Sequence, residues 1–547
     1  MRARHLWYES AIVYELDVRT FYDSNGDGWG DFQGLIHRLD YITALGANCI
    51  WLGPFNTSPH RDGGYDISDY YSIDPRVGTM GDFIEFMEEA KSRGLAVITE
   101  LVADHTSKDH PWFKEASSSR ESPLHDFYIW RNEPLLPEES PERVVFTGDD
   151  KDVWTKVDQI DQYYLHRFYE HEPDLNNANT SVQEEIFKVV AFYLRTGVSG
   201  FRVDAAPHVL SKVAEAPEYE DQYDYLREMR TFLMERWPDA VLMAEGDVAP
   251  KEIDEYFGQG DEMNMLLNFL LSQYIFLAMA EGDASSIHEL VGIMPKPPHQ
   301  GQYANFLRNH DELDLDRLDD RARRLVFDTF APEPSMRIYG RGIRRRLAPM
   351  LGGDRDRLRL AHSLLFGMPG TPVMYYGDEI GMGDDLDLPE RQSVRTPMQW
   401  HSGENGGFSN AKPDQLYLPP VAEGPYGYER VNVLDQQADA DSMLNWTRRL
   451  ISTRRQARPV ARGDWGVIED QDKQVLGIRY ELGGDVVFVY HNLSDEPQKA
   501  SYPDKREDLA FLYEIFGDSD YGHPDLDRSK FELNPLGYRW LQGRLTS

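Results

Sequence analysis

Eight short apolar segments, most of them separated by stretches of helical periodicity, are the feature that most restricts the fold of this 547-residue chain. Their apolar runs are continuous, as is typical of parallel strands buried on both faces. The intervening helices would connect one parallel strand to the next. The pattern predicts an α/β fold, the (β/α)8 TIM barrel, with strands in residues 11–21, 48–55, 95–102, 200–205, 240–246, 265–269, 303–311 and 371–379.

The clearest connecting helix precedes the fourth of these segments. Residues 181–184 read Ser-Val-Gln-Glu, a capping box that predicts a helix from about Ser181 to Gly197. Its apolar residues recur at helical spacing and would pack on the barrel as one face: Ile186, Val189, Val190 and Leu194.

Two departures from the barrel pattern predict further domains. Residues 105–174, rich in Pro, Ser and charge, are too long for an ordinary connection, and we predict an inserted subdomain above the barrel mouth. The barrel would then comprise residues 1–104 and 175–455. Alternating strands such as QVLGIRYEL follow, and they predict a C-terminal antiparallel β-sandwich domain over residues 456–547.

The composition restricts the classes of partner that the chain could bind and the cellular compartment in which we expect it. The chain has 57 Lys and Arg against 94 Asp and Glu, a net charge of −37, which argues against nucleic acid and membrane surfaces as partners. The single cysteine, Cys49, lies in an apolar run, which indicates a buried thiol and a reducing compartment. The first residues lack the apolar core of a signal peptide, so we expect a cytoplasmic protein. The sequence does not determine whether the chain forms a homodimer.

Polar residues follow several predicted strands, at the end of a barrel where catalytic groups lie. One acid there could be a helix cap. Three acids with one arginine and two histidines instead match retaining cleavage of a glycosidic bond, which needs two carboxyl groups about 5 Å apart. The set comprises Asp204, Glu245, Asp311, Arg202, His105 and His310.

The residue types also suggest the protonation of the two central acids. Asp204 has Arg202 two residues before it, so we expect an ionised carboxylate. Glu245 has no cation beside it in the sequence, and we expect a raised pKa, as a general acid requires.

Several strings resemble, in order, the sequence regions of the α-amylase superfamily, glycoside hydrolase family 13, over nearly the whole chain: LVADHTSKDHPWF, EPDLN, GFRVDAAP, MAEG, FLRNHDEL and GTPVMYYGDEIGM. The resemblance implies Asp204 as nucleophile, Glu245 as acid/base and Asp311 as the stabiliser of the transition state. It further implies that three residues hydrogen-bond the glucosyl unit being transferred: Arg202, His105 and His310.

The resemblance also implies a pocket closed at one end. In the α-glucosidase-like branch, residues matching Asp66 of RDGGYDISDYY and Arg395 of VRTPMQW form an ion pair at the blind end of the glucosyl pocket. Either residue alone would be read as a surface charge. Such a pocket accepts one non-reducing-end glucose, so the substrate would be a disaccharide or short oligosaccharide.

One polar loop predicts a metal site. DSNGDGWGD places Asp23, Asn25, Asp27 and Asp31 at alternating positions, with the carbonyl of Trp29 between them, which is oxygen-ligand spacing for a hard cation. A plain Asn-Gly and Asp-Gly turn is the alternative. The family resemblance implies structural Ca²⁺ here and no organic cofactor.

The resemblance implies a second ion between the barrel and the inserted subdomain. Its ligands would be Asp104, Asp174 and the carbonyl groups of His208 and Val209, although this chain has Ser211 where relatives carry an acid.

Within the family, FLRNHDELDLDRL and the segment from YYGDEIGM to VRTPMQW resemble the trehalose synthases, which isomerise maltose to trehalose. This chain departs from their pattern at Asp247, Glu100 and Glu172. An α-glucosidase that hydrolyses α-1,4 bonds, or a transferase to another acceptor, would need almost the same residues. A non-catalytic amylase-like interaction subunit is the alternative from another class, and the three retained acids argue against it.

Overall fold

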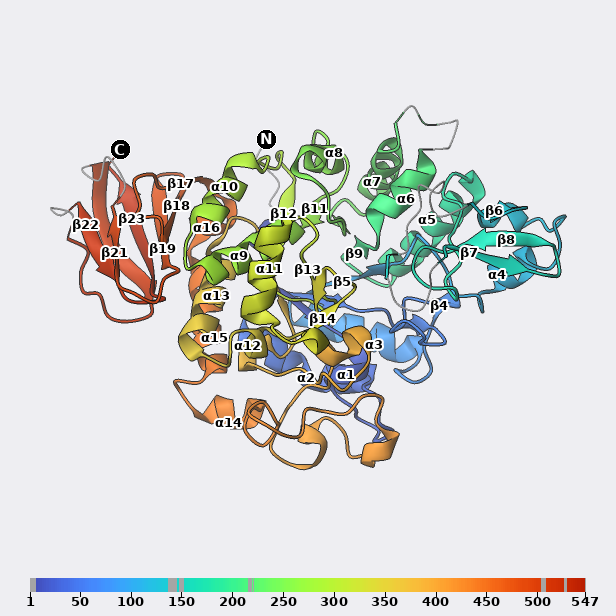
Figure 1. Ribbon diagram of the computed structural model, residues 1–547, viewed down its shortest axis with the longest axis horizontal. Helices are drawn as coiled ribbons and strands as arrows, with labels where there is room; N and C mark the ends of the chain where they lie inside the picture. Colours follow the sequence, from blue (N-terminus) through green and yellow to red (C-terminus); the bar gives the residue numbers. More distant parts are fainter. Residues whose placement is uncertain are drawn as a thin grey trace.

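In the computed structural model, eight parallel strands close into a barrel at the centre of the molecule (Figure 1). Each strand overlaps one predicted segment, so the predicted barrel is confirmed. The strands are β1 (Val13–Leu16), β2 (Cys49–Leu52), β5 (Ala96–Leu101), β9 (Gly200–Val203), β10 (Val241–Ala244), β11 (Met265–Leu267), β12 (Gln302–Asn305) and β16 (Thr371–Tyr375). The structure describes residues 6–135, 145–146, 152–214, 219, 221–502, 508–525 and 529–546.

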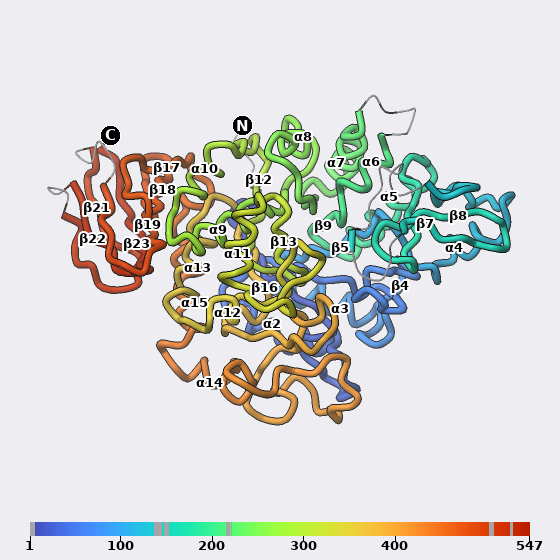
Figure 2. The backbone as a smooth tube through the Cα atoms, viewed as in Figure 1, coloured from blue at the N-terminus to red at the C-terminus, as the bar shows by residue number. Residues whose placement is uncertain are grey.

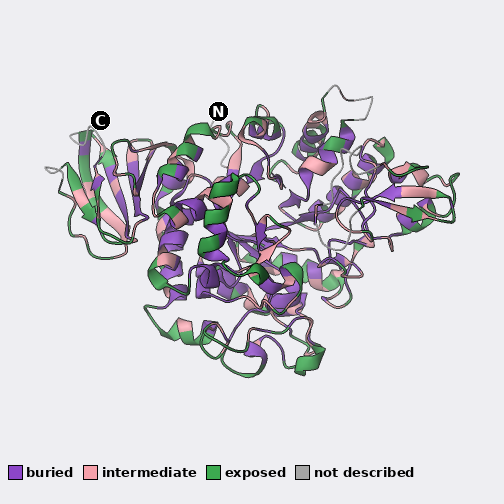
Figure 3. Ribbon diagram, viewed as in Figure 1, coloured by how far each residue is buried: buried purple, intermediate pink, exposed green. Residues whose placement is uncertain are grey.

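The barrel strands are buried on both faces, as their continuous apolar runs predicted (Figure 3). Inside the barrel, apolar side chains from different strands form one cluster that includes Cys49, Trp51 and Met243. The thiol of Cys49 is fully buried there and serves as a small apolar group. Outside the barrel, a larger cluster joins the strands to the helices.

The main helices between the strands are α2 (Phe32–Leu45), α3 (Met80–Ser92), α5 (Thr180–Arg195), α7 (Asp224–Arg236), α9 (Phe269–Glu281), α11 (Asp320–Phe330) and α13 (Arg355–Gly367). In the described part of the chain, each helix is too short or too polar to cross a membrane.

Helix α5 carries the apolar face that its sequence predicted, and all four of its predicted face residues are buried. The predicted capping box was wrong. The helix begins one residue earlier, and the side chain of Asn179 accepts a hydrogen bond from the amide of Ser181 at 2.9 Å. Asn is as good an N-cap as Ser, so the residue upstream takes the role.

The segment between β5 and α5 forms a small unit at one end of the molecule (Figure 2). It contains α4 (Pro111–Ala116) and a three-stranded antiparallel sheet of β6 (Trp130–Arg131), β8 (Gln162–Leu165) and β7 (Trp154–Val157). A β-bridge between His105 and Asp174 joins the two ends of this segment above β5. Part of its Pro-rich stretch, residues 136–144, lies outside the described residues.

At the opposite end, α15 (Met443–Gln456) and α16 (Arg458–Arg462) lead into a five-stranded antiparallel sheet. Its order is β17 (Asp464–Val467), β18 (Val475–Leu482), β19 (Asp485–Asn492), β23 (Tyr538–Leu545) and β21 (Leu509–Gly517). One face packs on the barrel helices, where Tyr480 donates a hydrogen bond to the carbonyl of Gly367 at 2.6 Å. The other face shares an apolar cluster with β20 (Gln498–Ser501) and β22 (Lys530–Leu533).

Candidate active site

The carboxyl ends of the barrel strands surround a cavity of about 540 Å³. Asp204 directly follows β9 and Glu245 directly follows β10, while Asp311 comes six residues after β12. All three acids line the cavity, together with His105 beyond the end of β5. The predicted strand-end residues therefore meet in one place, because parallel strands end at one edge of the barrel.

One buried guanidinium holds the two central acids. Arg202 is 1% exposed and contacts Asp204 through Nη1 and Glu245 through Nη2. Because the two terminal nitrogens of one planar group each bind a carboxylate, the two acids face each other across it. Arg202 lies behind the acids and is absent from the cavity wall, so in this structure it positions carboxylates and does not face the sugar site.

A third acid completes the environment of Arg202. Glu100 Oε2 accepts a hydrogen bond from Arg202 Nη1 at 2.7 Å, and its Oε1 accepts one from the indole of Trp51 at 2.6 Å. Glu100 is the departure from the family pattern noted in the sequence. Its side chain ties the guanidinium to the neighbouring strand β5.

Burial raises the pKa of Glu245 to about 7 although Arg202 opposes the shift, and the charges of Asp204 and Asp311 raise it further. The predicted rise in the pKa of Glu245 is confirmed, but its cause is burial. The prediction assumed that no cation lies beside this acid, whereas Arg202 contacts it. Burial also raises the pKa of Asp204, while Arg202 lowers it. The predicted ionised state took account of Arg202 alone, and burial, which the sequence does not show, reverses the direction of the shift.

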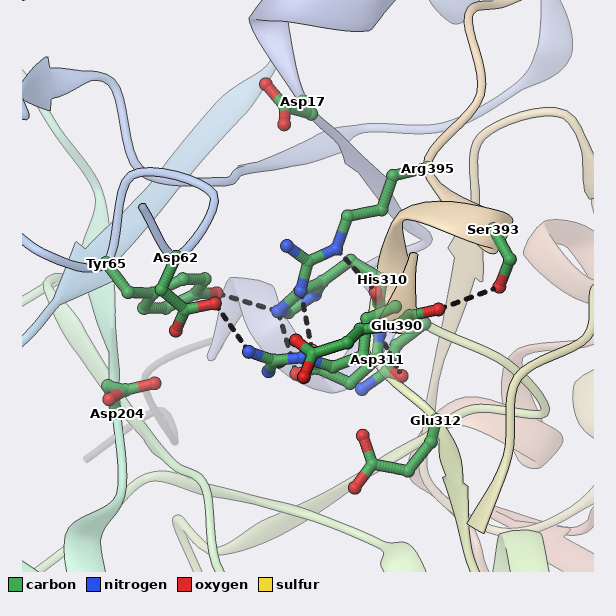
Figure 4. A network of polar contacts seen from close by, with 12 residues as sticks. Asp17, Asp62, Tyr65, Asp204, His310, Asp311, Glu312, Glu390, Ser393 and Arg395 are labelled. Atoms are coloured by element: carbon green, nitrogen blue, oxygen red, sulfur yellow. Dashed lines mark hydrogen bonds and ion pairs between the residues drawn. The ribbon is translucent and has the colours of Figure 1, made fainter. Parts of the chain in front are cut away.

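Asp311, the third acid that lines the cavity, lies among cations, as Figure 4 shows. Asp311 Oδ1 accepts hydrogen bonds from Arg391 at 2.8 Å and Arg395 at 2.7 Å, and its Oδ2 lies 3.0 Å from His310 Nε2. Burial works against the charge, but His310 and the arginines hold the pKa of Asp311 well below its usual range. This residue is a fixed negative charge facing the site.

His310 is held from both sides. Its Nδ1 lies 2.5 Å from Glu15 Oε1, and Tyr65 stacks on its ring with the phenol oxygen 2.7 Å from Nε2. Burial lowers the pKa of His310, yet Asp311 and Glu15 outweigh it and raise the pKa to about 10. Tyr65, which sequence reasoning missed, lines the cavity and offers a face for a sugar ring.

The predicted ion pair between Asp66 and Arg395 is wrong. Asp66 is fully buried, and its oxygens accept hydrogen bonds from Ser58 at 2.6 Å and from the amide of Arg61 at 3.1 Å. Asp62, four residues earlier in the same string, lines the cavity instead, and its Oδ1 lies 2.5 Å from Arg391.

Asp62, Arg391, Asp311 and Arg395 therefore form a chain of alternating charges, and the first three line the cavity. Two features of the sequence are consistent with it. Gly63 has a φ of +55°, and a Cβ there would collide with the guanidinium of Arg395, so only glycine fits beside this arginine. Arg391 lies in the same segment as Arg395, four residues upstream.

His105 faces the cavity and has an acid behind it. Its ring packs against Phe168, and its Nε2 lies 3.8 Å from Glu172 Oε1. Burial lowers the pKa of His105, but the charge of Glu172 outweighs it and raises the pKa to about 10. His105 Nδ1 lies 3.5 Å from Asp104 Oδ2, so the buried ring nitrogens face two acids, one on each side.

Charged residues line the outer part of the cavity. Asp247 Oδ1 lies 3.2 Å from Arg317 Nε, and Arg341 Nε donates a hydrogen bond to Asp314 at 3.0 Å. Burial raises the pKa of Asp247 to about 7, and Arg317 opposes the shift. In the sequence, Asp247 departs from the trehalose synthase pattern, but only the folded structure shows that it pairs with Arg317.

In the loop that was predicted to bind the first metal ion, a carboxylate accepts hydrogen bonds from the amide groups of the loop itself. Asp23 accepts hydrogen bonds from the amides of residues 25, 26 and 28, and Asp31 caps helix α2. In the described ranges, His, Cys, Asp and Glu side chains gather in no group of three suited to a metal. Binding here would therefore also need Asn25 and the carbonyl of Trp29, all oxygen donors that suit calcium.

A lysine takes the place of the second predicted ion. Lys212 Nζ lies 2.7 Å from Asp104 Oδ1 and 2.9 Å from Asp174 Oδ2, and it also donates to the carbonyl of Asp104. The carbonyl of His208 accepts hydrogen bonds from Ser211 and Arg167. The buried ammonium supplies the positive charge between these acids, so the predicted site that included His208 and Val209 is not supported.

Comparison with known proteins places these residues in context. The model of the α-amylase catalytic domain matches residues 17–320 and 344–463. Trehalose synthase from Pimelobacter sp. is 38% identical over 99% of this chain and 96% of its own length. Trehalose synthase from Thermus thermophilus is 42% identical over 97% of this chain, which spans 55% of that longer protein. Trehalulose synthase from Pseudomonas mesoacidophila aligns with a TM-score of 0.76 at 25% identity, covering 98% of this chain and 99% of that one.

The pKa of Glu245 predicts how activity depends on pH. A general acid must be protonated, so kcat/KM on an α-glucoside should fall as the pH rises through about 7. Asp247 has a similar pKa and serves as the control, because Asp247→Asn should leave this fall in place. If the fall disappears in Asp247→Asn, Glu245 is not the group that titrates.

The contacts of Lys212 predict a large effect on stability. Lys212→Met removes the ammonium that lies between the buried Asp104 and Asp174, which should cost about 3–5 kcal/mol in urea unfolding. Lys188→Met removes an exposed ion pair with Glu185 on α5 and should change little. Equal stability of the two variants would contradict the role of Lys212.

Proposed function

The chain belongs to the α-amylase family, and on that premise we propose that it isomerises maltose to trehalose through a covalent glucosyl-enzyme. It is an enzyme that acts on sugars. The observation that carries the proposal is the pair of carboxylates that the Arg202 guanidinium holds at the wall of the cavity. That arrangement supports retaining chemistry.

In the first step, Asp204 attacks the anomeric carbon of the non-reducing glucose as Glu245 gives its proton to the glycosidic oxygen. The bond between the two sugars breaks, and glucose is released within the cavity while a glucosyl ester forms on Asp204. The fixed negative charge of Asp311 lies beside this unit and would stabilise the positive charge that develops on the ring. His310 would act through Asp311, which it holds in place.

In the second step, the released glucose turns and presents its anomeric hydroxyl group. Glu245, now ionised, accepts the hydroxyl proton as the oxygen attacks the glucosyl ester, and Asp204 leaves as a carboxylate. Each of the two displacements inverts the anomeric carbon, so together they retain its α configuration, and attack by the α-anomeric hydroxyl group of glucose gives an α,α-linked product with both enzyme groups restored. No external reactant is consumed.

The charged wall supports a small substrate. Asp62 and Arg391 close the cavity beside Asp311, which leaves room for one glucosyl unit on that side. A cavity of about 540 Å³ is in the range of small-ligand sites. Asp247, Glu312, Arg317 and Arg341 line the outer part, where the released glucose would be held.

Hydrolysis is the second candidate function, because water could replace the second glucose. The same acids and the same closed wall would serve an α-glucosidase. The trehalose synthases at 38% and 42% identity favour isomerisation. Transfer to another acceptor would need the same glucosyl ester.

We also propose that the loop of Asp23, Asn25, Asp27, Trp29 and Asp31 binds structural Ca²⁺. The support is its set of oxygen donors. The ion would link the loop to the start of α2, whose N-cap is Asp31, and it would take no part in the chemistry.

Product analysis tests the proposed reaction. Purified protein incubated with maltose in calcium-containing buffer should give trehalose, detected by its anomeric proton signal in NMR, with less free glucose than trehalose. Parallel incubations with isomaltose, sucrose and trehalose define the linkage preference. Asp204→Asn serves as the control and should give no product. Glucose without trehalose would contradict isomerisation and favour the α-glucosidase.

A further inference from the structure

A second hollow lies at the other end of the barrel, where the strands begin. It has a volume of about 360 Å³ and is bounded by residues just before β1 and β2 and by α15 and α16. None of the nine residues that line it is acidic, and four of them are arginines: Arg454, Arg455, Arg458 and Arg462. This concentration of positive charge contrasts with the net charge of −37 of the whole chain.

The most buried arginine of this hollow has no acidic partner among the residues that the structure describes. Arg454 is 2% exposed, and its Nη2 donates to the carbonyl of Gly370 at 2.7 Å. Its Nη1 has no hydrogen-bond partner among the described residues. Burial lowers the pKa of Arg454 to about 10, as expected of a cation with no acid beside it.

The outer arginines repel one another. Arg458 and Arg462 lie four residues apart on α16, where like charges destabilise a helix. Arg462 donates to Ser10 Oγ at 2.9 Å. Burial lowers the pKa of Arg462, the charge of Glu9 opposes that shift, and the charge of Arg458 adds to it. Within the described ranges, Arg454, Arg455 and Arg458 form no ion pair with a carboxylate.

The end of a helix explains only part of this cluster. Cations near the C-terminus of α15 are favoured by the helix dipole, which accounts for Arg454 and Arg455. Arg455 donates weakly to the carbonyl of Gly46 at 3.3 Å. The dipole does not account for two more guanidinium groups on the next helix, facing the same hollow.

We propose that this hollow is a binding site for a small phosphate ester of the size of a sugar phosphate. Guanidinium groups bind phosphate oxygens in pairs, and several of them around one hollow match a doubly charged group. The volume lies within the range of small-ligand sites. The overall negative charge of the chain disfavours an extended polyanion such as nucleic acid.

Binding at this position would act on the barrel from the end opposite the catalytic cavity. The hollow touches residues that precede β1 and β2, and Arg454 holds Gly370 immediately before β16. A bound anion would neutralise the arginines and tie α15 and α16 to three adjacent barrel strands. The structure therefore assigns to this site an effect on stability.

The test is calorimetric titration and thermal unfolding of the full chain with glucose 6-phosphate, inorganic phosphate or potassium chloride at equal ionic strength. Glucose 6-phosphate should bind saturably and raise Tm, phosphate should do so more weakly, and chloride should have no effect. The double variant Arg455→Ala/Arg458→Ala, changed at two exposed positions, should lose at least about tenfold in affinity.

Arg449→Ala is the matched control, since this exposed arginine lies on α15 outside the hollow. It should bind glucose 6-phosphate like the unaltered chain. Undiminished affinity in the double variant would overturn the proposal, because glucose 6-phosphate would then bind elsewhere, as in the catalytic cavity. Absence of saturable binding to the unaltered chain would overturn it as well. Equal affinity for phosphate and its ester would support the site and identify the phosphate group as the part recognised.

Discussion

The contacts of Arg202 with Asp204 and Glu245 are the interaction on which the catalytic site depends. Two acids placed a few ångströms apart in a buried site repel each other, and a single cation between them reduces that cost. Arg202 is itself held by Glu100, which an indole hydrogen bond fixes in turn. Removing the guanidinium would leave three buried acids without compensation, so the geometry and the protonation of the site both rest on it.

The same solution recurs around the barrel mouth, where cations contact several other buried acids. His310, Arg391 and Arg395 surround Asp311, and Lys212 joins Asp104 to Asp174. The lysine also connects the end of β5 to the returning end of the inserted segment. At the other face of the barrel the pattern is reversed: Arg454, Arg455 and Arg458 form no ion pair with an acid within the described ranges, and there the missing charge is expected to come from a ligand.

Local pattern predicted most of the fold and the acids that meet at the cavity. The eight apolar runs identified the barrel strands because strands buried on both faces have few polar residues. Residues that directly follow those strands, such as Asp204 and Glu245, then had to meet at one edge. Their positions depend on short-range structure alone, which a sequence displays.

Contacts between distant segments could not be predicted in this way. Asp62 and Arg391 are 329 positions apart, and nothing in the string RDGGYDISDYY shows that Asp62 faces the cavity while Asp66 turns toward Ser58. Lys212 follows Ser211 directly, but only the fold brings its ammonium between two acids. The pKa of Asp204 was misjudged for a related reason, because the extent of burial is a property of the packed structure.

The most direct test of the account is to locate the covalent intermediate. Glu245→Gln incubated with α-glucosyl fluoride, whose leaving group needs no acid, should accumulate a glucosyl ester, and peptide mass spectrometry should find it on Asp204. An adduct on another residue, or none, would contradict the roles given to both acids.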